Sequence, residues 1–421
     1  MSPRVYYDET EREVKVPEGW KMDIIQPQTL QSSKTEDEIV SESLKHPIGA
    51  ASFEQFVQDS SSFLLILNDH ARATPTPIVL KQILPFLDGK DFGIIVASGT
   101  HPIPSEKDLE EKILGEYYSK LRDLLVFHDS KATDQFITLG TTSRGTELRI
   151  NKIIDRYEAI IAINSIEPHY FAGFTGGRKS FLPGISAYES IEANHSMALL
   201  DESRMLLLKG NPLHEDFEEA AHFVTQIHPV FGINVVLDGS RKIVGSFSGN
   251  LFEQLYEGAE LAKTIYAPTI TETPDVLIAV VHSPLDQNLY QAQKGFENCL
   301  FALKPGGIMI LVASCYDGIG PADYSQMLQS SDSPEDLAKK FEEIKKNYQL
   351  GWHKVGSIPM FLKDKELWMV TKLPQENLKR MFIRGFDNLQ SAIDEALRKK
   401  GAGSRVLVVH DSANVCPILK P

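Results

Sequence analysis

Apolar runs of five to seven residues, each followed by polar residues, recur in the first part of the chain. Residues 63–67, 92–97 and 157–163 are almost wholly apolar, as expected for strands that are buried on both faces of a parallel sheet. Helical patterns lie between them, at residues 78–87 and 107–114. This alternation predicts βαβ units and an α/β fold with mainly parallel sheets.

The same pattern restarts in the second part of the chain and predicts a second α/β domain. Apolar runs at residues 275–281 and 308–313 again fit buried strands. We therefore expect an N-terminal domain of residues 1–270 and a smaller C-terminal domain of residues 271–400. A last apolar run lies within residues 401–421 and fits a strand of either sheet, so this segment is left open to return to the N-terminal domain.

Composition narrows the class of protein and its partners. The 421 residues are 42% hydrophobic and 24% charged, which is typical of a globular protein of two domains. The formal net charge of −14 argues against binding to nucleic acid or to an anionic membrane. The start of the chain lacks a signal-peptide pattern, and the three cysteines lie in separate contexts without a Cys-x-x-Cys motif. We therefore expect a protein of the reducing cytoplasm, with no nucleic-acid and no membrane partner.

One segment concentrates residues that carry chemistry. Two histidines, His169 and His195, bracket a glycine-rich loop. The loop contains Gly176, Gly177, Arg178 and Lys179. Glycines allow a close approach of the backbone to a ligand, the basic pair suits a phosphate, and histidine suits metal binding or proton transfer. The alternative is a glycine turn that opens a helix, but the flanking histidines favour a cofactor site.

Three further clusters follow predicted strands, where ligands of parallel sheets bind. Asp69 and Arg72 come after the first strand, and His101 follows the second within Ser-Gly-Thr-His. The third cluster contains Tyr290, Gln291 and Lys294. Each also has an ordinary structural explanation, namely a helix cap with a solvated arginine, a turn with a surface histidine and a solvated helix face.

In their order and spacing, these motifs resemble the lactate racemase family, which depends on a nickel-pincer nucleotide and acts on 2-hydroxy acids. The matching patterns are Asp-x-x-Arg, Gly-Thr-His, His-x9-Lys-x15-His and Tyr-Gln-x-x-Lys, and the resemblance extends over residues 3–415. It implies two α/β domains with the active site in the cleft between them, the N-terminal one binding the cofactor and nickel. It also implies a racemase or epimerase that inverts C2 through a 2-keto acid.

The resemblance implies a role for each motif residue. Lys179 is expected to carry the cofactor covalently, a pyridinium-3-thioamide-5-thiocarboxylic acid mononucleotide, and His195 is expected to bind its nickel. His101 and His169 resemble the two acid/base histidines. Further residues are expected to contact the cofactor, with its phosphate near the loop: Asp69, Arg72, Gly176, Gly177 and Arg178. The substrate, a small 2-hydroxy acid, is expected to bind Tyr290, Gln291 and Lys294.

The resemblance also implies partner proteins that make and load the cofactor. Three other functions stay open on the residues alone. A nicotinamide-dependent dehydrogenase fits the fold but lacks the dinucleotide-binding glycine motif. A metal hydrolase would use His101, His169 and His195, although it needs more hard ligands. A carrier of the cofactor without catalytic activity would have no use for the paired histidines.

Overall fold

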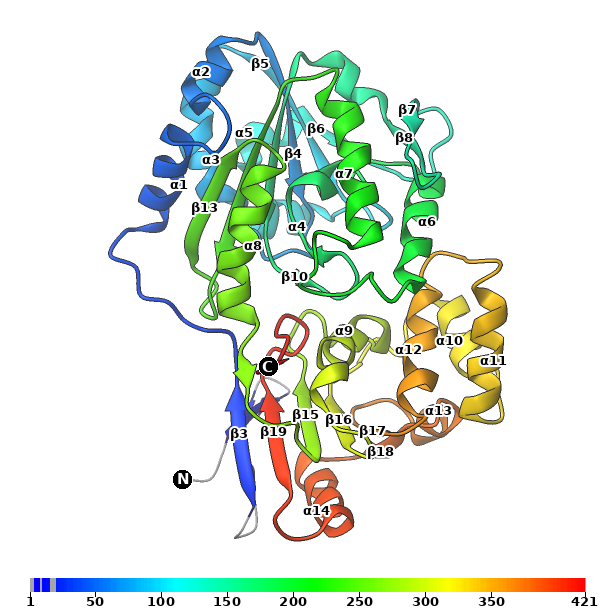
Figure 1. The fold of residues 1–421 in the computed structure, drawn as a ribbon. Coiled ribbons are helices and arrows are strands. Elements are labelled where there is room, and N and C mark those ends of the chain that lie inside the picture. The colour runs from blue at the N-terminus through cyan, green and yellow to red at the C-terminus, as the bar shows by residue number, and fades with distance from the viewer. Residues whose placement is uncertain (1–3, 8–9, 16–19, 421) are drawn as a thin grey trace. The chain divides into compact units, whose positions relative to one another are not determined.

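The computed structural model describes residues 4–7, 10–15 and 20–420 (Figure 1). The chain forms two compact units. The first unit contains residues 28–265, and the second contains the residues up to 27 together with Tyr266–Pro421.

The first unit is built on a six-stranded sheet with the order β13-β12-β9-β4-β5-β6. All neighbours in it are parallel except β12 and β13. The three apolar runs predicted from the sequence are its central strands β4, β5 and β9, and this prediction is confirmed. The six strands are β4 (Ser62–Asn68), β5 (Asp91–Ala97), β6 (Leu125–Phe127), β9 (Ala159–Ser165), β12 (Val230–Leu237) and β13 (Ile243–Gly249).

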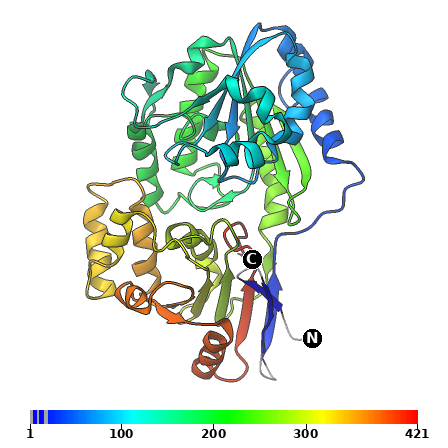
Figure 2. The ribbon, with the colours of Figure 1, turned by 180° about the vertical axis from the view of Figure 1, so that it is seen from behind.

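Helices cover both faces of this sheet. Alternate strand residues such as Leu65, Ile94 and Ile161 form one core with α1, α2 and α3, which lie toward the viewer in Figure 2, whereas α7 and α8 lie on the face seen in Figure 1. Because both faces are covered, the strands are apolar throughout rather than alternating. The helices are α1 (Glu36–Lys45), α2 (Phe53–Gln58), α3 (Thr76–Ile83), α4 (Glu106–Asp108), α5 (Tyr118–Leu121), α6 (Tyr188–Ser196), α7 (Pro212–Thr225) and α8 (Glu253–Tyr266).

Two small hairpins complete the first unit. They are formed by β7 (Phe136–Thr141) with β8 (Glu147–Asn151), and by β10 (Pro168–His169) with β11 (Gly173–Phe174).

The second unit contains a six-stranded parallel sheet with the order β18-β17-β16-β15-β19-β3. Its strands are β3 (Lys21–Ile25), β15 (Val276–Val280), β16 (Ile308–Val312), β17 (Glu366–Val370), β18 (Arg384–Phe386) and β19 (Arg405–Val409). Helices α9 and α12 pack on one face of the sheet and α14 packs on the other. Its helices are α9 (Leu289–Cys299), α10 (Ala322–Leu328), α11 (Pro334–Ile344), α12 (His353–Phe361), α13 (Gln375–Arg380) and α14 (Leu389–Lys400).

The structure corrects the expected domain boundaries at both ends of the chain. Strand β19 pairs with β15, so residues 401–421 stay with the second unit and do not return to the first. Strand β3 pairs with β19, so the residues up to 27 belong to the second unit and not to an N-terminal domain of residues 1–270. The sequence Lys-Met-Asp-Ile-Ile of β3 carries no strong apolar signal, because an edge strand is held mainly by backbone hydrogen bonds. The short β20 (Ile418–Leu419) pairs with β14 (Thr269–Ile270), and β1 (Arg4–Tyr7) pairs with β2 (Thr10–Glu13).

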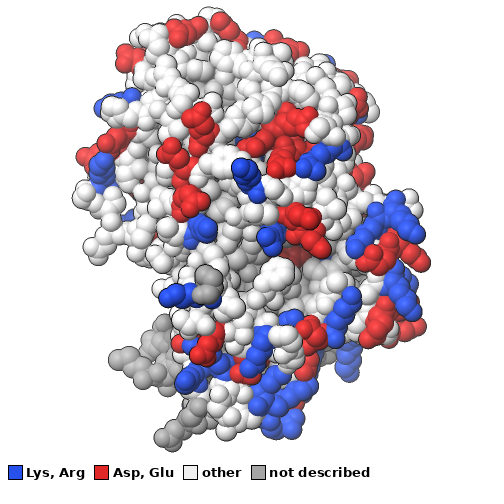
Figure 3. Space-filling model, in the orientation of Figure 1, with Lys and Arg blue, Asp and Glu red and all other residues white. Residues whose placement is uncertain are grey.

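The surface charge and the hydropathy of the helices do not change this description of the fold. Figure 3 shows acidic and basic side chains interspersed on the visible face. None of the helices in the described part of the chain combines the length and apolar character needed to cross a bilayer.

Candidate active site

Asp69 lies in the turn that follows β4. Its carboxylate is buried, and Oδ1 accepts a hydrogen bond of 3.3 Å from the backbone nitrogen of Ala71. Arg72 closes the same turn, because its backbone nitrogen donates to the Asp69 carbonyl oxygen at 3.2 Å. The next helix begins only at Thr76. The alternative that Asp69 caps a helix is therefore wrong.

The other carboxylate oxygen of Asp69 holds His101, which follows β5. Nδ1 of His101 is 2.6 Å from Oδ2 of Asp69. Burial raises the pKa of Asp69, but the hydrogen bond and charge of His101 outweigh it, so the net shift is downward. Because the ionised carboxylate can only accept, a neutral His101 carries its proton on Nδ1 and presents Nε2 as a proton acceptor. The Asp69 side chain is 4% exposed and that of His101 is 43% exposed, so a buried carboxylate orients an accessible base.

Arg72 faces a carboxylate that the sequence analysis did not assign. Nη1 of Arg72 is 3.8 Å from Oε2 of Glu167, a buried residue. Ser165, at the end of β9, donates to Oε1 of Glu167 at 2.9 Å, and Thr74 hydrogen-bonds Ser165 at 2.8 Å. Glu167 therefore joins the turn after β4 to the segment that begins after β9. In the sequence, the position of Glu167 directly before Pro168-His169 was the signal that could have identified it.

His169 lies at the tip of the β10–β11 hairpin, opposite Gly173. The backbone nitrogen of Ala172 donates to its Nδ1 at 3.3 Å, so a neutral His169 carries its proton on Nε2. Its ring meets the ring of Phe171 edge to face, with centroids 4.5 Å apart. The ring of Phe171 is in turn 5.2 Å from that of His195. The ring of Phe171 thus contacts both histidines of the central motif.

Arg178 is fully buried, and its guanidinium holds the loop rather than a ligand. All five of its N–H donors are used within the protein. The acceptors, at 2.9–3.1 Å, are the carbonyl oxygens of Ala172, Phe174, Thr175 and Gly176 and Nδ1 of His214. This corrects the expectation that Arg178 binds the cofactor phosphate, because it has no donor left for one.

The two glycines of this loop also contact other residues of the protein. Gly176 has φ +96°, and a Cβ there would lie 2.9 Å from Oδ1 of Asn234. The backbone nitrogen of Gly177 donates to the same oxygen at 3.1 Å. Both glycines therefore serve the close packing of the loop against β12, and the N–H of Gly177 is not available to a phosphate.

Lys179 directly follows Arg178 in this buried loop. Its Nζ lies 5.7 Å from the ring centroid of Phe171 and 5.3 Å from that of Phe217 on α7. His195, near the end of α6, contacts the same two rings, with centroids 5.2 and 6.1 Å away. Burial, together with the charge of Lys179, lowers the pKa of His195 to about 3. Its imidazole is therefore neutral at ordinary pH, as a metal ligand must be.

The turn that carries His101 is tied to the Lys179 loop by backbone hydrogen bonds. The nitrogen of Gly99 donates to the carbonyl oxygen of Gly184 at 2.9 Å. The nitrogen of Gly184 donates to the carbonyl oxygen of Lys179 at 3.0 Å. The first unit therefore brings together residues that lie up to 126 positions apart, between Asp69 and His195.

In the second unit, the predicted Tyr290, Gln291 and Lys294 share the first turns of α9. Asn288 caps this helix by accepting a hydrogen bond of 3.0 Å from the nitrogen of Gln291. All three predicted residues are partly exposed, whereas Gln293 between them is buried. Helix geometry places Gln291 and Lys294 on one accessible face.

Among the described residues, no group of three or more His, Cys, Asp or Glu side chains is arranged to hold a metal ion. The ligand set of a mononuclear hydrolase, with His101, His169 and His195 as ligands, is therefore not formed.

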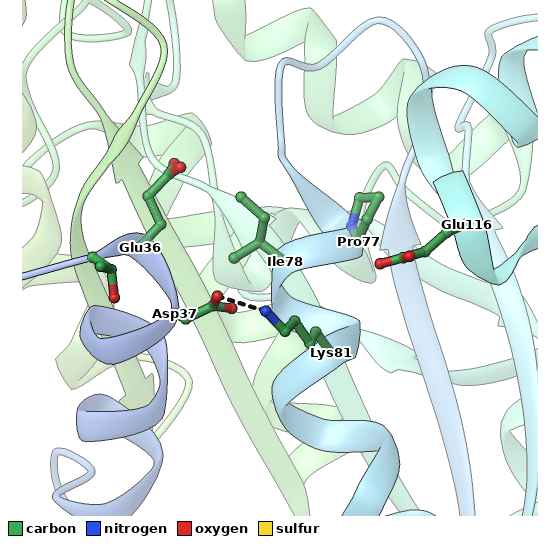
Figure 4. Close-up of a pocket in the computed structure, with 7 residues that line it drawn as sticks. Glu36, Asp37, Pro77, Ile78, Lys81 and Glu116 are labelled. Carbon is green, nitrogen blue, oxygen red and sulfur yellow. Dashed lines mark hydrogen bonds and ion pairs between the residues drawn. The ribbon is translucent and has the colours of Figure 1, made fainter.

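A pocket between α1 and α3 contains none of these residues (Figure 4). Its charged lining consists of Glu36, Asp37, Lys81 and Glu116. Nζ of Lys81 is 2.7 Å from Oδ2 of Asp37, an exposed ion pair that links the two helices. We assign this pocket no chemistry.

Comparisons with known proteins agree over nearly the whole chain. Residues 7–206 match the lactate racemase N-terminal domain, and residues 271–416 match the lactate racemase C-terminal domain. The chain is 30% identical over 389 residues to lactate racemase from Thermoanaerobacterium thermosaccharolyticum, which is 90% of each chain. It is 28% identical over 400 residues, 93% of each chain, to lactate racemase from Lactiplantibacillus plantarum.

Solved structures show the same likeness. The lactate racemase apoprotein from Thermoanaerobacterium thermosaccharolyticum superposes with a TM-score of 0.90 at 28% identity, over 100% of both chains. A protein from Thermotoga maritima shares the fold, with a TM-score of 0.71 at 17% identity over 91% of this chain and 98% of that one. The chain therefore belongs to the lactate racemase family, and it is an isomerase.

Proposed function

We propose that this protein racemises lactate or a closely related 2-hydroxy acid with the help of a nickel-pincer nucleotide. The observation that carries the proposal is the meeting of Lys179 and His195 on the same two aromatic rings, beside His169. The two curated relatives named above are lactate racemases, which supports the choice of substrate.

The residues of the first unit fit such a cofactor. His195 is a neutral imidazole, and its Nδ1 is buried. We propose His195 as the protein ligand of nickel and the amine of Lys179 as the covalent anchor. Because no other ligand cluster exists in the described residues, the remaining nickel ligands would come from the cofactor, whose sulfur donors suit this ion. When bound, the cofactor supplies the acceptor and donor of a hydride at C2. We propose that the proteins that make the cofactor and load it are partners of this protein.

The protein's own residues would transfer the hydroxyl proton of the substrate. The C2–H bond of a 2-hydroxy acid is a very weak acid, so inversion is easier through loss of hydride, with the hydroxyl proton removed by a base. We propose that Nε2 of His101 accepts this proton, which the contact of 2.6 Å between Asp69 and Nδ1 of His101 supports. His169 is proposed to serve the hydroxyl of the other enantiomer, since the planar 2-keto acid must be reduced from its opposite face. To accept that proton at Nε2, its own proton would move to Nδ1, which opens the hydrogen bond of 3.3 Å from the Ala172 nitrogen.

We propose that the second unit binds the substrate through Tyr290, Gln291 and Lys294. A lysine ammonium is a suitable partner for the substrate carboxylate, and the tyrosine and glutamine side chains offer hydrogen bonds to oxygen. Asp69 and Arg72 are proposed to line the cofactor site. We also propose a cytoplasmic location, which suits three free, buried cysteines.

The direct test uses protein matured with the cofactor and incubated separately with D-lactate and L-lactate. Chiral chromatography should show conversion of each enantiomer toward a racemic mixture, and nickel should co-purify. Bound cofactor without exchange of the C2 hydrogen in either enantiomer would instead support a carrier of the cofactor.

The two-base assignment has its own test. His101→Ala and His169→Ala should both abolish racemisation, because turnover in either direction needs both rings. Single-turnover formation of pyruvate should survive in each variant from one enantiomer, with opposite preferences. Near-normal racemisation by either variant would refute the assignment of that histidine.

A further inference from the structure

A buried lysine of the second unit contacts Tyr290, one of the proposed substrate-binding residues. Lys354, near the start of α12, is 2% exposed. Its Nζ donates a hydrogen bond of 2.6 Å to the backbone carbonyl oxygen of Tyr290. The same ammonium lies 4.4 Å from the centroid of the Tyr290 ring, within the range of a cation–π interaction. A single side chain thus holds both the backbone and the ring of Tyr290.

The remaining surroundings of Tyr290 leave its ring little freedom. The ring of Tyr324 meets it edge to face, with centroids 5.1 Å apart. A Cβ at Gly320, where φ is +124°, would come within 2.6 Å of the Tyr290 Cβ. A Cβ at Gly351, where φ is +91°, would come within 3.2 Å of the Tyr290 hydroxyl. Two glycine turns therefore approach Tyr290 closely.

A polar network around the lysine connects three helices. Glu297, buried on α9, accepts hydrogen bonds of 2.8 Å from both Gln293 and Ser357. Gln293 also donates to the Lys354 carbonyl oxygen at 2.6 Å and accepts from the Tyr324 hydroxyl. Burial lowers the pKa of Lys354 to about 8 and raises that of Glu297, and each charge opposes the shift of the other. These hydrogen bonds attach helix α12 to α9 through Gln293 and Glu297.

Packing alone does not require a charge at this place. A buried ammonium is costly, and an apolar side chain of similar length would fill the same volume without that cost. What an apolar side chain cannot do is donate to the Tyr290 carbonyl and attract the face of its ring. The interactions that depend on the ammonium include those with Tyr290 and Glu297.

We propose that Lys354 is a positioning residue, which fixes Tyr290 and the first turn of α9 and so presents Gln291 and Lys294 to the substrate. The part of this proposal that concerns substrate rests on the function proposed above. The part that concerns Tyr290 does not, and it is testable on protein without cofactor.

The first experiment is hydrogen–deuterium exchange of the full chain, comparing Lys354→Met with the wild type. Amides in the first turn of α9 should exchange about tenfold faster in the variant, as expected when a hydrogen bond from a charged donor is lost. The matched control is Lys363→Met, because Lys363 is exposed just beyond α12 and should leave these amides unchanged. If Lys354→Met is poorly folded, the double variant Lys354→Met/Glu297→Gln removes the unpaired carboxylate and gives the same comparison. Unchanged exchange in α9 would overturn the proposal.

The second experiment measures kinetics of the cofactor-loaded enzyme with D-lactate. Lys354→Met should raise KM about tenfold and change kcat less than about threefold, because the residue acts on binding and not on proton transfer. In combination with Tyr290→Ala, the effects on KM should be less than additive, since both changes disturb the same contact. A wild-type KM together with faster exchange in α9 would overturn the role in substrate binding. Absence of any lactate racemisation by the wild type would refute the proposed function and, with it, this role in substrate binding, whereas the exchange result would still decide the contact with Tyr290.

Discussion

Replacing Arg178 tests whether its side chain stabilises the fold or binds a ligand. Replacing it by methionine removes five hydrogen bonds while their acceptors, four of them backbone carbonyls, stay buried. Hydrogen bonds from a charged donor contribute about 1.5–3 kcal/mol each, but those of one side chain do not add. Breaking a buried charged network from one side costs about 3–5 kcal/mol. We therefore expect Arg178→Met to lower the free energy of unfolding by about 3–5 kcal/mol.

The assay is urea unfolding of the protein without cofactor, followed by circular dichroism. Tryptophan fluorescence is recorded in parallel and reports on the second unit, because Trp20, Trp352 and Trp368 all belong to it. Arg178→Lys should be destabilised less than Arg178→Met, since an ammonium still offers three donors and a thioether offers none. The control is Arg144→Met. Arg144 forms an exposed ion pair of 2.7 Å with Glu215 and should change stability by less than about 1 kcal/mol.

The result that would refute this reasoning is equally specific. If Arg178 bound a phosphate instead, Arg178→Met would keep wild-type stability within about 1 kcal/mol and lose affinity for the cofactor alone.

Three further predictions concern the chemistry and the buried lysine. Asp69→Asn should lower kcat by about 10²–10⁴-fold, because His101 loses its preferred tautomer; near-normal turnover with an unchanged pH profile would contradict this. Lys179→Ala, exposed to the cofactor and its loading proteins, should show the unmodified mass of the chain by intact-protein mass spectrometry, and a retained adduct would place the anchor elsewhere. Lys354, which lies near Glu297 and Tyr290, has a pKa lowered to about 8, below the ~10.4 of an unfolded lysine. The unfolded chain binds more protons between these values, so wild-type stability should rise with pH from about 8 to 10.5 relative to Lys354→Met, and parallel urea-unfolding profiles would contradict it.

Most of the sheet architecture was predictable from local pattern. Strands β4, β5 and β9 are apolar at nearly every position because helices cover both faces of their sheet, and such runs are visible in the sequence. Strand β3 was missed because its residues are half-exposed and its place at the edge beside β19 depends on backbone pairing with residues nearly 400 positions away. No local signal records such a pairing.

The candidate site divides in the same way. The chemical character of each residue and the spacing of the motifs were sufficient to recognise the family and to select Asp69, His101 and His195. They were not sufficient to separate Arg178 from Lys179, because both are long cations in one glycine-rich loop. Glu167 was passed over, since its contact with Arg72 exists only after β4 and β9 are paired.

The sequence by itself therefore determined the α/β class, the residues able to do chemistry and the family to which the chain belongs, because apolar runs and side-chain types are local properties. The tertiary structure alone decided which of those residues are occupied elsewhere. Arg178 has every donor satisfied by four buried carbonyls and by His214, whereas Lys179 lies near the rings of Phe171 and Phe217 beside His195. Whether the fold itself uses a polar group depends on partners that only folding brings within hydrogen-bonding distance.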